Sequence, residues 1–150
     1  MQALNWPKYP EIGLALVRIV VGVVFFVHGW QKLFMFGFEG TAGFLGSIGV
    51  PAPLVMAVVV TLVELLGGLA LIVGLFTRLA AIPIAVTMLV ALFTAHLANG
   101  FFASNGGYEF VLTLFVANVS LALAGGGAFA VDNMLLDRPK STNRRVVTAS

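Results

Sequence analysis

Four apolar stretches, separated by short polar or glycine-rich segments, constrain this chain more than any other feature of its sequence. They cover residues 12–35, 53–76, 79–97 and 108–124. A helix needs about 20 mostly apolar residues to cross a bilayer, and no stretch shows the period-two alternation of a membrane β-strand. Only 9% of the residues are charged, which is too few to cover a water-soluble domain. The sequence therefore predicts an all-α integral membrane protein, built as a four-helix up-down bundle.

The first long loop, residues 37–53, predicts a short interfacial helix at the outer side of the membrane. Its larger apolar residues fall on one helical face, which suits a helix lying along the bilayer surface: Phe44, Leu45 and Ile48. Thr41 is expected to cap the start of this helix, and Gly49 with Pro51 to end it.

The distribution of basic residues predicts the orientation of the chain in the membrane. Six bases lie at the N-terminus, in the short turn between the second and third stretches, and in the C-terminal tail: Lys8, Arg78, Arg138, Lys140, Arg144 and Arg145. Because basic loops stay in the cytoplasm, we expect both termini to be cytoplasmic and Arg78 to be a cytoplasmic anchor. We expect a membrane domain over residues 1–131 and a basic cytoplasmic tail over residues 132–150.

Ionisable residues inside the apolar stretches are costly, so each needs a partner or a function. Arg18, His28 and Lys32 fall within one arc of the first stretch, at 100° per residue. Glu64 lies near the middle of the second stretch, and Arg18 lies somewhat lower on the first. We therefore expect Arg18 and Glu64 to form a deep ion pair, which either neutralises two buried charges or handles a ligand.

A second group of polar residues is expected at the outer end of the bundle. His28 and His96 lie at similar heights, roughly 24 and 26 Å from the cytoplasmic end of their helices. Helical spacing therefore predicts one outer cavity, lined by His28, Lys32, His96, Asn99 and Glu109. The alternative is a polar seal, in which the same side chains bond only to one another.

Three blocks of this sequence resemble the DoxX family in their order and spacing: LVRIVVGVVFFVHGWQKLF, ELLGGLALIVGLFTRLAA and TAHLANGFFASNGGYEF. The resemblance covers residues 12–131. It implies a four-helix bundle of the bacterial cytoplasmic membrane, associated with quinone-linked oxidation of thiosulfate, with thiol stress, or with resistance to quinone-like compounds. The positions that match the family's motifs are Arg18, His28, Lys32, Glu64, Gly67, Arg78, His96, Asn99 and Glu109.

Two functions follow from these residues and this resemblance. The first is a quinone-interacting redox protein, or a subunit of a membrane oxidoreductase complex, because imidazole, ammonium and carboxyl groups can bond a carbonyl and move protons. Its catalytic residues would be His28, Lys32, His96 and Glu109, and its ligand-binding residues Arg18, Glu64, Asn99 and Tyr108. The alternative is non-enzymatic: a small-molecule binding or permeation protein, or a membrane scaffold for a soluble redox partner. Whether the protein is an enzyme stays open.

The sequence predicts neither a metal site nor a covalently bound cofactor, because it has no cysteine and no dinucleotide-binding or phosphate-binding motif. Quinone is the expected ligand. Haem b between His28 and His96 is not expected, because Lys32 and Glu109 would make that pocket polar. Expected partners are the lipid bilayer and a lipophilic small molecule, with a redox subunit and self-association left open. Nucleic acid is not expected, because the net charge is only +2.

Overall fold

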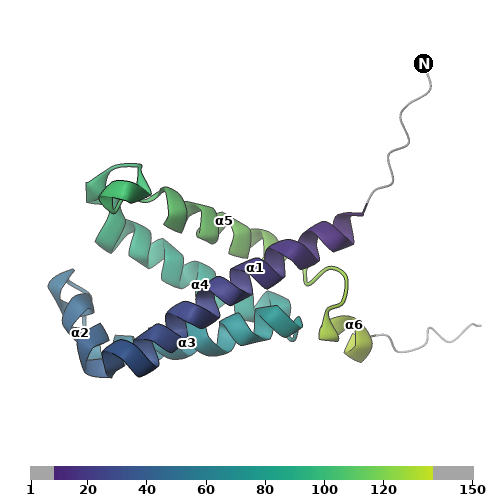
Figure 1. The fold of residues 1–150 in the computed structure, drawn as a ribbon, viewed down its shortest axis with the longest axis horizontal. Coiled ribbons are helices and arrows are strands. Elements are labelled where there is room, and N and C mark those ends of the chain that lie inside the picture. The colour runs from purple at the N-terminus through teal and green to yellow at the C-terminus, as the bar shows by residue number, and fades with distance from the viewer. Residues whose placement is uncertain (1–8, 137–150) are drawn as a thin grey trace, which may run out of the picture.

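The computed structural model describes residues 9–136, which form helices joined by turns (Figure 1). Three helical segments are long and apolar enough to cross a membrane, and a fourth apolar helix is shorter: Pro10–Ser47, Pro53–Val73, Thr77–Asn99 and Glu109–Ala124. The described part of the chain contains no strand. The predicted all-α membrane bundle is confirmed.

The long segments are built from several helical elements. The first contains α1 (Pro10–Gln31), the π-helical turn η1 (Lys32–Phe36) and α2 (Gly37–Ser47). The others, in chain order, are α3 (Pro53–Val73), α4 (Thr77–Ala91), the π-helical turn η2 (Leu92–His96), the 3₁₀ turns η3 (Leu97–Asn99) and η4 (Ala103–Asn105), α5 (Glu109–Ala124) and α6 (Val131–Leu136). Proline begins both α1 and α3, since its ring favours the first helical turn.

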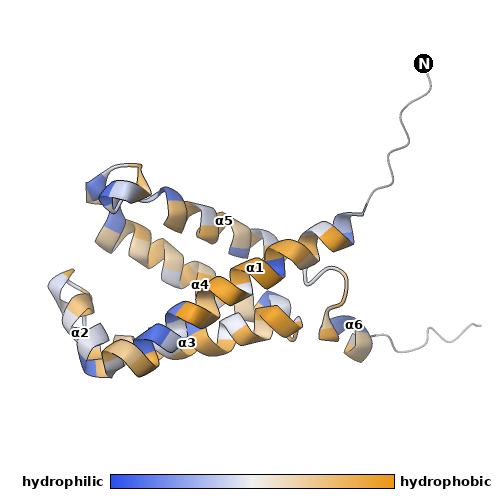
Figure 2. Ribbon diagram, viewed as in Figure 1, coloured by the Kyte–Doolittle hydropathy of each residue, from blue (hydrophilic) through white to orange (hydrophobic). Residues whose placement is uncertain are grey.

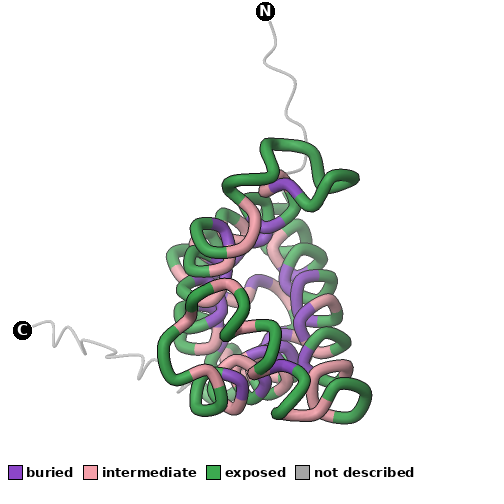
Figure 3. The backbone as a smooth tube through the Cα atoms, turned by 90° about the vertical axis from the view of Figure 1, so that its left-hand side faces the viewer, coloured by how far each residue is buried: buried purple, intermediate pink, exposed green. Residues whose placement is uncertain are grey.

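The four main helices are arranged as two pairs. α1 packs mainly on α3, and α4 mainly on α5, with smaller contacts between α3 and α4 and between α1 and α5. The pairs meet near the α3–α4 turn and diverge toward α2 and the loop before α5 (Figure 1). We call these the closed end (residues 74–77 and 125–133) and the open end (residues 37–52 and 97–108). Buried residues lie on the inward faces of the helices (Figure 3).

Glycines set the register between α1 and α3. Gly22 and Gly29 of α1 and Gly68 of α3 each lie so close to the opposite helix that an added Cβ would overlap the backbone of that helix. The facing residues are Gly22 with Ile72, Phe26 with Gly68, and Gly29 with Leu65. Small residues allow such close approach of membrane helices. This antiparallel register places Glu64 level with Trp30, and Arg18 level with Phe76.

α2 is the short helix predicted in the first loop, and it packs against α3. It begins at Gly37, whose φ of 69° turns the chain away from η1. The predicted cap at Thr41 is therefore wrong: Thr41 lies within α2 and is buried. The helix ends before Gly49, whose φ of 81° provides the expected stop.

The short helix α6 folds back onto the closed end. The Asp132 carboxylate accepts hydrogen bonds from the backbone N–H groups of Phe76, at 2.6 Å, and Thr77, at 2.9 Å. The Asp132 N–H donates to the Gly74 carbonyl at 3.0 Å. These bonds hold the start of α6 against the turn between α3 and α4.

Much of the predicted tail, residues 137–150, lies outside the described residues. So do five of the six bases on which the predicted orientation depends: Lys8, Arg138, Lys140, Arg144 and Arg145. The orientation stays a prediction.

Candidate functional site

Lys32, the first residue of η1 after α1, forms an ion pair with Glu64 of α3. Lys32 Nζ lies 2.6 Å from Glu64 Oε2, a short distance that marks a strong charge-assisted hydrogen bond. The Glu64 side chain is 5% exposed and the Lys32 side chain 22%. Hydrophilic residues interrupt the largely hydrophobic helices near the end of α1 (Figure 2).

The predicted ion pair between Arg18 and Glu64 is wrong. Glu64 is level with Trp30 in the observed register, so twelve residues of helix, about 18 Å, separate it from the level of Arg18. Lys32 lies only two residues past that level, and its long side chain covers the remaining distance.

His28, on the surface of α1, is a third polar residue near this ion pair. It lies one helical turn before Lys32 and is exposed. It is also near enough to Glu64 to act electrostatically on its carboxylate. An ammonium, a carboxylate and an accessible imidazole thus lie together, a set of groups that can bind a polar ligand atom and exchange protons. We call Lys32, Glu64 and His28 the α1–α3 cluster.

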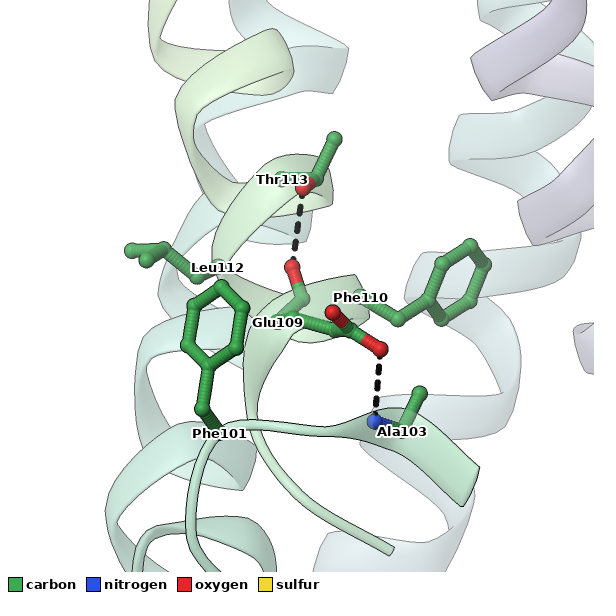
Figure 4. Close-up of a pocket in the computed structure, with 6 residues that line it drawn as sticks. All are labelled: Phe101, Ala103, Glu109, Phe110, Leu112 and Thr113. Atoms are coloured by element: carbon green, nitrogen blue, oxygen red, sulfur yellow. Dashed lines mark hydrogen bonds between the residues drawn. The ribbon is translucent and has the colours of Figure 1, made fainter.

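His96, Asn99 and Glu109 belong to a second group, in the segment between α4 and α5. His96 Nδ1 lies 2.7 Å from the Gly106 carbonyl oxygen, and Asn99 Nδ2 donates to the same oxygen at 3.2 Å. Glu109 Oε1 accepts a hydrogen bond from the Ala103 N–H at 2.7 Å (Figure 4). These side chains tie the loop to the ends of the two helices. We call His96, Asn99 and Glu109 the α4–α5 cluster.

A hollow of about 390 Å³ lies beside Glu109. Its lining comes from the loop and the first turns of α5: Phe101, Ala103, Glu109, Phe110, Leu112 and Thr113. The rings of Phe101 and Phe110 lie on either side of Glu109 (Figure 4). Tyr108, a predicted ligand-binding residue, is half-buried and packs edge-on against Phe101, with ring centroids 5.5 Å apart. Neither histidine lines this hollow.

The structure does not bring the predicted outer residues into one cavity. His28 and Lys32 belong to the α1–α3 cluster, whereas His96, Asn99 and Glu109 bond to the loop before α5. The reason is the divergence of the two helix pairs toward the open end (Figure 1). Equal heights along two helices do not imply contact, because they leave the lateral separation undetermined.

Arg18 lies at the closed end and is 1% exposed. Its guanidinium occupies the space beside Gly74 and Gly126, where an added Cβ would overlap it or press against it. Its Nε and Nη1 have no hydrogen-bond partner among the described residues. Asp132 lies close enough to offset its charge electrostatically. Sequence reasoning missed Asp132, because the N–H groups that it caps lie 55 and 56 residues earlier in the chain.

Arg78, the predicted anchor, is exposed at the same end. Its Nη2 donates to the Ala124 carbonyl, at the end of α5, over 3.4 Å. A basic group at this position is attracted by the partial negative charge at the C-terminus of α5.

Asn118 is a buried polar residue that the predicted site omitted. It is 0% exposed in the middle of α5, and its Nδ2 donates to the Leu114 carbonyl at 2.8 Å. Its Oδ1 has no partner within the described residues. A polar amide inside an apolar stretch was a signal that could have placed it in the bundle interior.

Within residues 9–136, no group of three or more His, Asp or Glu side chains is placed to hold a metal ion.

Comparison with known proteins adds a family match. A family model described as DoxX matches residues 13–97. "Putative oxidoreductase CatD" of Bacillus subtilis (strain 168) is 38% identical over 133 residues, covering 89% of this chain and 94% of that protein. "Inner membrane protein YqjF" of Escherichia coli (strain K12) is 31% identical, covering 85% of this chain and 95% of that protein. No solved structure gives a significant match.

Proposed function

This chain belongs to the DoxX family of membrane proteins, and from that premise we propose that it is a quinone-interacting redox protein or a subunit of a membrane oxidoreductase complex. The observation that carries the proposal is the 2.6 Å ion pair between Lys32 and Glu64 on apolar helices. Charged groups within membrane helices are costly, so they commonly mark functional sites. The Bacillus subtilis relative is named an oxidoreductase, which supports the redox class.

The α1–α3 cluster has the groups that a quinone headgroup requires. Lys32 donates a hydrogen bond to a quinone oxygen, and its ion pair with Glu64 positions the ammonium group of Lys32. His28, exposed one helical turn before Lys32, donates a second bond and exchanges protons with the ligand. A ligand arriving from the lipid meets His28 first, because Glu64 is buried behind the ion pair.

Reduction of a quinone to a quinol takes two electrons and two protons. In this proposal the protons pass through the α1–α3 cluster. The electrons come from a thiol or thiosulfate reductant, or from a redox partner subunit, since the sequence has no flavin or nicotinamide motif.

Two matched histidine variants test this function. The experiment measures binding of a short-chain quinone to the protein in lipid nanodiscs. Quenching of the protein's tryptophan fluorescence reports the binding. His28→Ala should weaken binding about fivefold, the effect of losing one hydrogen bond of about 1 kcal/mol. His96→Ala should leave binding unchanged, because His96 bonds to the loop carbonyl of Gly106. Equal binding by both folded variants and the unmodified protein would reject the proposal.

The second candidate function is a non-enzymatic one, as a small-molecule binding protein or a membrane scaffold for a soluble redox partner. The α4–α5 cluster favours it, because His96 and Glu109 bond to backbone atoms of their own loop. A scaffold would tolerate both histidine variants and would retain its partner in a pull-down from membranes. Partner loss in a variant of the loop, with quinone binding unaffected, would favour this candidate over the first.

A further inference from the structure

A second hollow, of about 310 Å³, lies at the closed end, away from the α1–α3 cluster. It is formed by the first turn of α1, the start of α4, the glycines after α5, and α6. The side chains that give it chemical character are those of Glu11, Phe76, Arg78, Leu79 and Asp132.

This hollow contains charges of both signs. Arg78 is exposed, and its one hydrogen bond within the described residues is the 3.4 Å contact with the Ala124 carbonyl. The exposed Glu11 carboxylate forms no hydrogen bond or ion pair with another described residue. Asp132 adds negative charge, although its oxygens already cap α4. One guanidinium and one carboxylate, those of Arg78 and Glu11, are therefore accessible to a ligand.

The hollow also adjoins the apolar surface of the helices. Phe76 and Leu79, which line it, are 60% and 67% exposed. Leu123, one residue before the hollow's Ala124, is 74% exposed. The site therefore lies where the apolar surface of the spanning helices meets a polar end, which is the position of lipid headgroups.

We propose that this hollow binds the headgroup of a phospholipid that carries a primary ammonium group, such as phosphatidylethanolamine. Arg78 contacts the phosphate, and the Glu11 carboxylate accepts hydrogen bonds from the ammonium group. The acyl chains lie along Phe76 and Leu79. A headgroup without a cation would meet uncompensated carboxylates, and a choline headgroup has no N–H to donate.

Lipid binding to delipidated protein tests the proposal by native mass spectrometry. The protein is titrated with phosphatidylethanolamine, phosphatidylcholine and phosphatidylglycerol that carry the same acyl chains. Phosphatidylethanolamine should bind about tenfold more tightly than phosphatidylcholine, the effect of a charge-assisted hydrogen bond. Equal binding of the three lipids, or tightest binding of phosphatidylglycerol, would overturn the proposal.

Variants assign the two charges. Glu11→Gln should abolish the preference for phosphatidylethanolamine over phosphatidylcholine, whereas Arg78→Gln should weaken binding of both lipids. Glu39→Gln, at an exposed glutamate of α2, is the matched control and should keep the preference. A preference that survives Glu11→Gln overturns the proposal, and this arm decides the question alone if Arg78→Gln does not fold.

A competition experiment distinguishes a membrane lipid from a soluble ligand of the same chemistry. Glycerophosphoethanolamine has the same headgroup but no acyl chains to lie along Phe76 and Leu79. It should compete only weakly with the lipid. If it competes as well as the lipid does, the hollow is a site for a soluble phosphate amine and the lipid assignment fails.

Discussion

The position of each residue along the helix, and not the length of its side chain, decides which charges meet in this bundle. Lys32 and Arg18 both have long side chains on the first helical segment, but only Lys32 lies within reach of Glu64 in the register set by the glycines. Arg18 is left at the closed end, where Asp132 offsets its charge. The polar residues of the first helical segment thus belong to two separate places: Lys32 to the α1–α3 cluster, and Arg18 to the closed end.

Removing both charges of the Lys32–Glu64 pair should cost less stability than removing the Glu64 charge alone. Glu64→Gln leaves Lys32 without a counterion, so the free energy of unfolding should fall. The loss should lie near the low end of the ~3–5 kcal/mol typical of broken buried pairs, because the Lys32 side chain is only partly buried. The added substitution Lys32→Met should restore most of the loss. Thermal unfolding in detergent measures both.

Glu109→Gln is the control for that cycle. Glutamine can still accept the hydrogen bond from the Ala103 N–H, so its effect on unfolding should be small. A double variant as unstable as Glu64→Gln alone would show that the pair is not the source of the loss.

At the scale of elements, close backbone contacts and one carboxylate cap fix the geometry. α1 and α3 approach each other closely at glycines. α4 begins where the Asp132 carboxylate accepts hydrogen bonds from the N–H groups of Phe76 and Thr77. Phe76 itself has a φ of 49°, so the tight turn before α4 holds a non-glycine residue in the left-handed region. The cap and the close helix contact therefore position the closed end.

Two glycine variants within α1 should differ strongly. A Cβ at residue 29 would overlap the Leu65 backbone, whereas a Cβ at residue 13 would meet nothing within 4 Å. Gly29→Ala should therefore destabilise the protein by at least ~1–3 kcal/mol, the cost of overpacking. Gly13→Ala should be neutral or stabilising by up to ~1 kcal/mol, because alanine favours helix. Thermal melts of the two variants check this, and equal effects would contradict the close α1–α3 contact.

Removal of the Asp132 carboxylate should loosen the start of α4. Asp132→Ala should cost at least about 0.5–2 kcal/mol, the effect of losing a helix cap, because it also removes the negative charge near Arg18. It should speed hydrogen exchange at the amides of Phe76 and Thr77. Asn133→Ala removes only a 2.9 Å bond to the Gly127 carbonyl, and should leave exchange at those two amides unchanged. Unaltered exchange in Asp132→Ala would contradict the observed cap.

The whole molecule consists of two helix pairs that join at one end. Arg18, Asp132 and α6 lie at the closed end, whereas the α4–α5 cluster lies at the open end. In a membrane, the two ends face opposite sides.

The bias of basic residues predicts that the closed end is the cytoplasmic one. The chain has no cysteine, so single cysteines can report exposure to a membrane-impermeant maleimide in whole cells. Ser104→Cys, in the loop at the open end, should label from outside. Ser141→Cys, in the C-terminal tail, should label only after the membrane is permeabilised. The reverse pattern would show that the predicted orientation is wrong.

The sequence by itself determined the membrane class, the helical stretches and the short helix of the first loop. These depend on local properties: apolar length, few charges, and glycines or prolines at the boundaries. It also identified Glu64 as a charge within the membrane that needs a partner, because that cost depends on residue type and depth.

Only the tertiary structure decided which of these residues meet. The partner of Glu64 depends on the register between α1 and α3, which glycine contacts fix to within a residue. The separation of His28 from His96 depends on the divergence of the helix pairs. The role of Asp132 depends on its hydrogen bond with the Thr77 N–H, 55 residues earlier in the chain. Helical periodicity gives height and face on one helix, but it carries no information about the lateral position of the next.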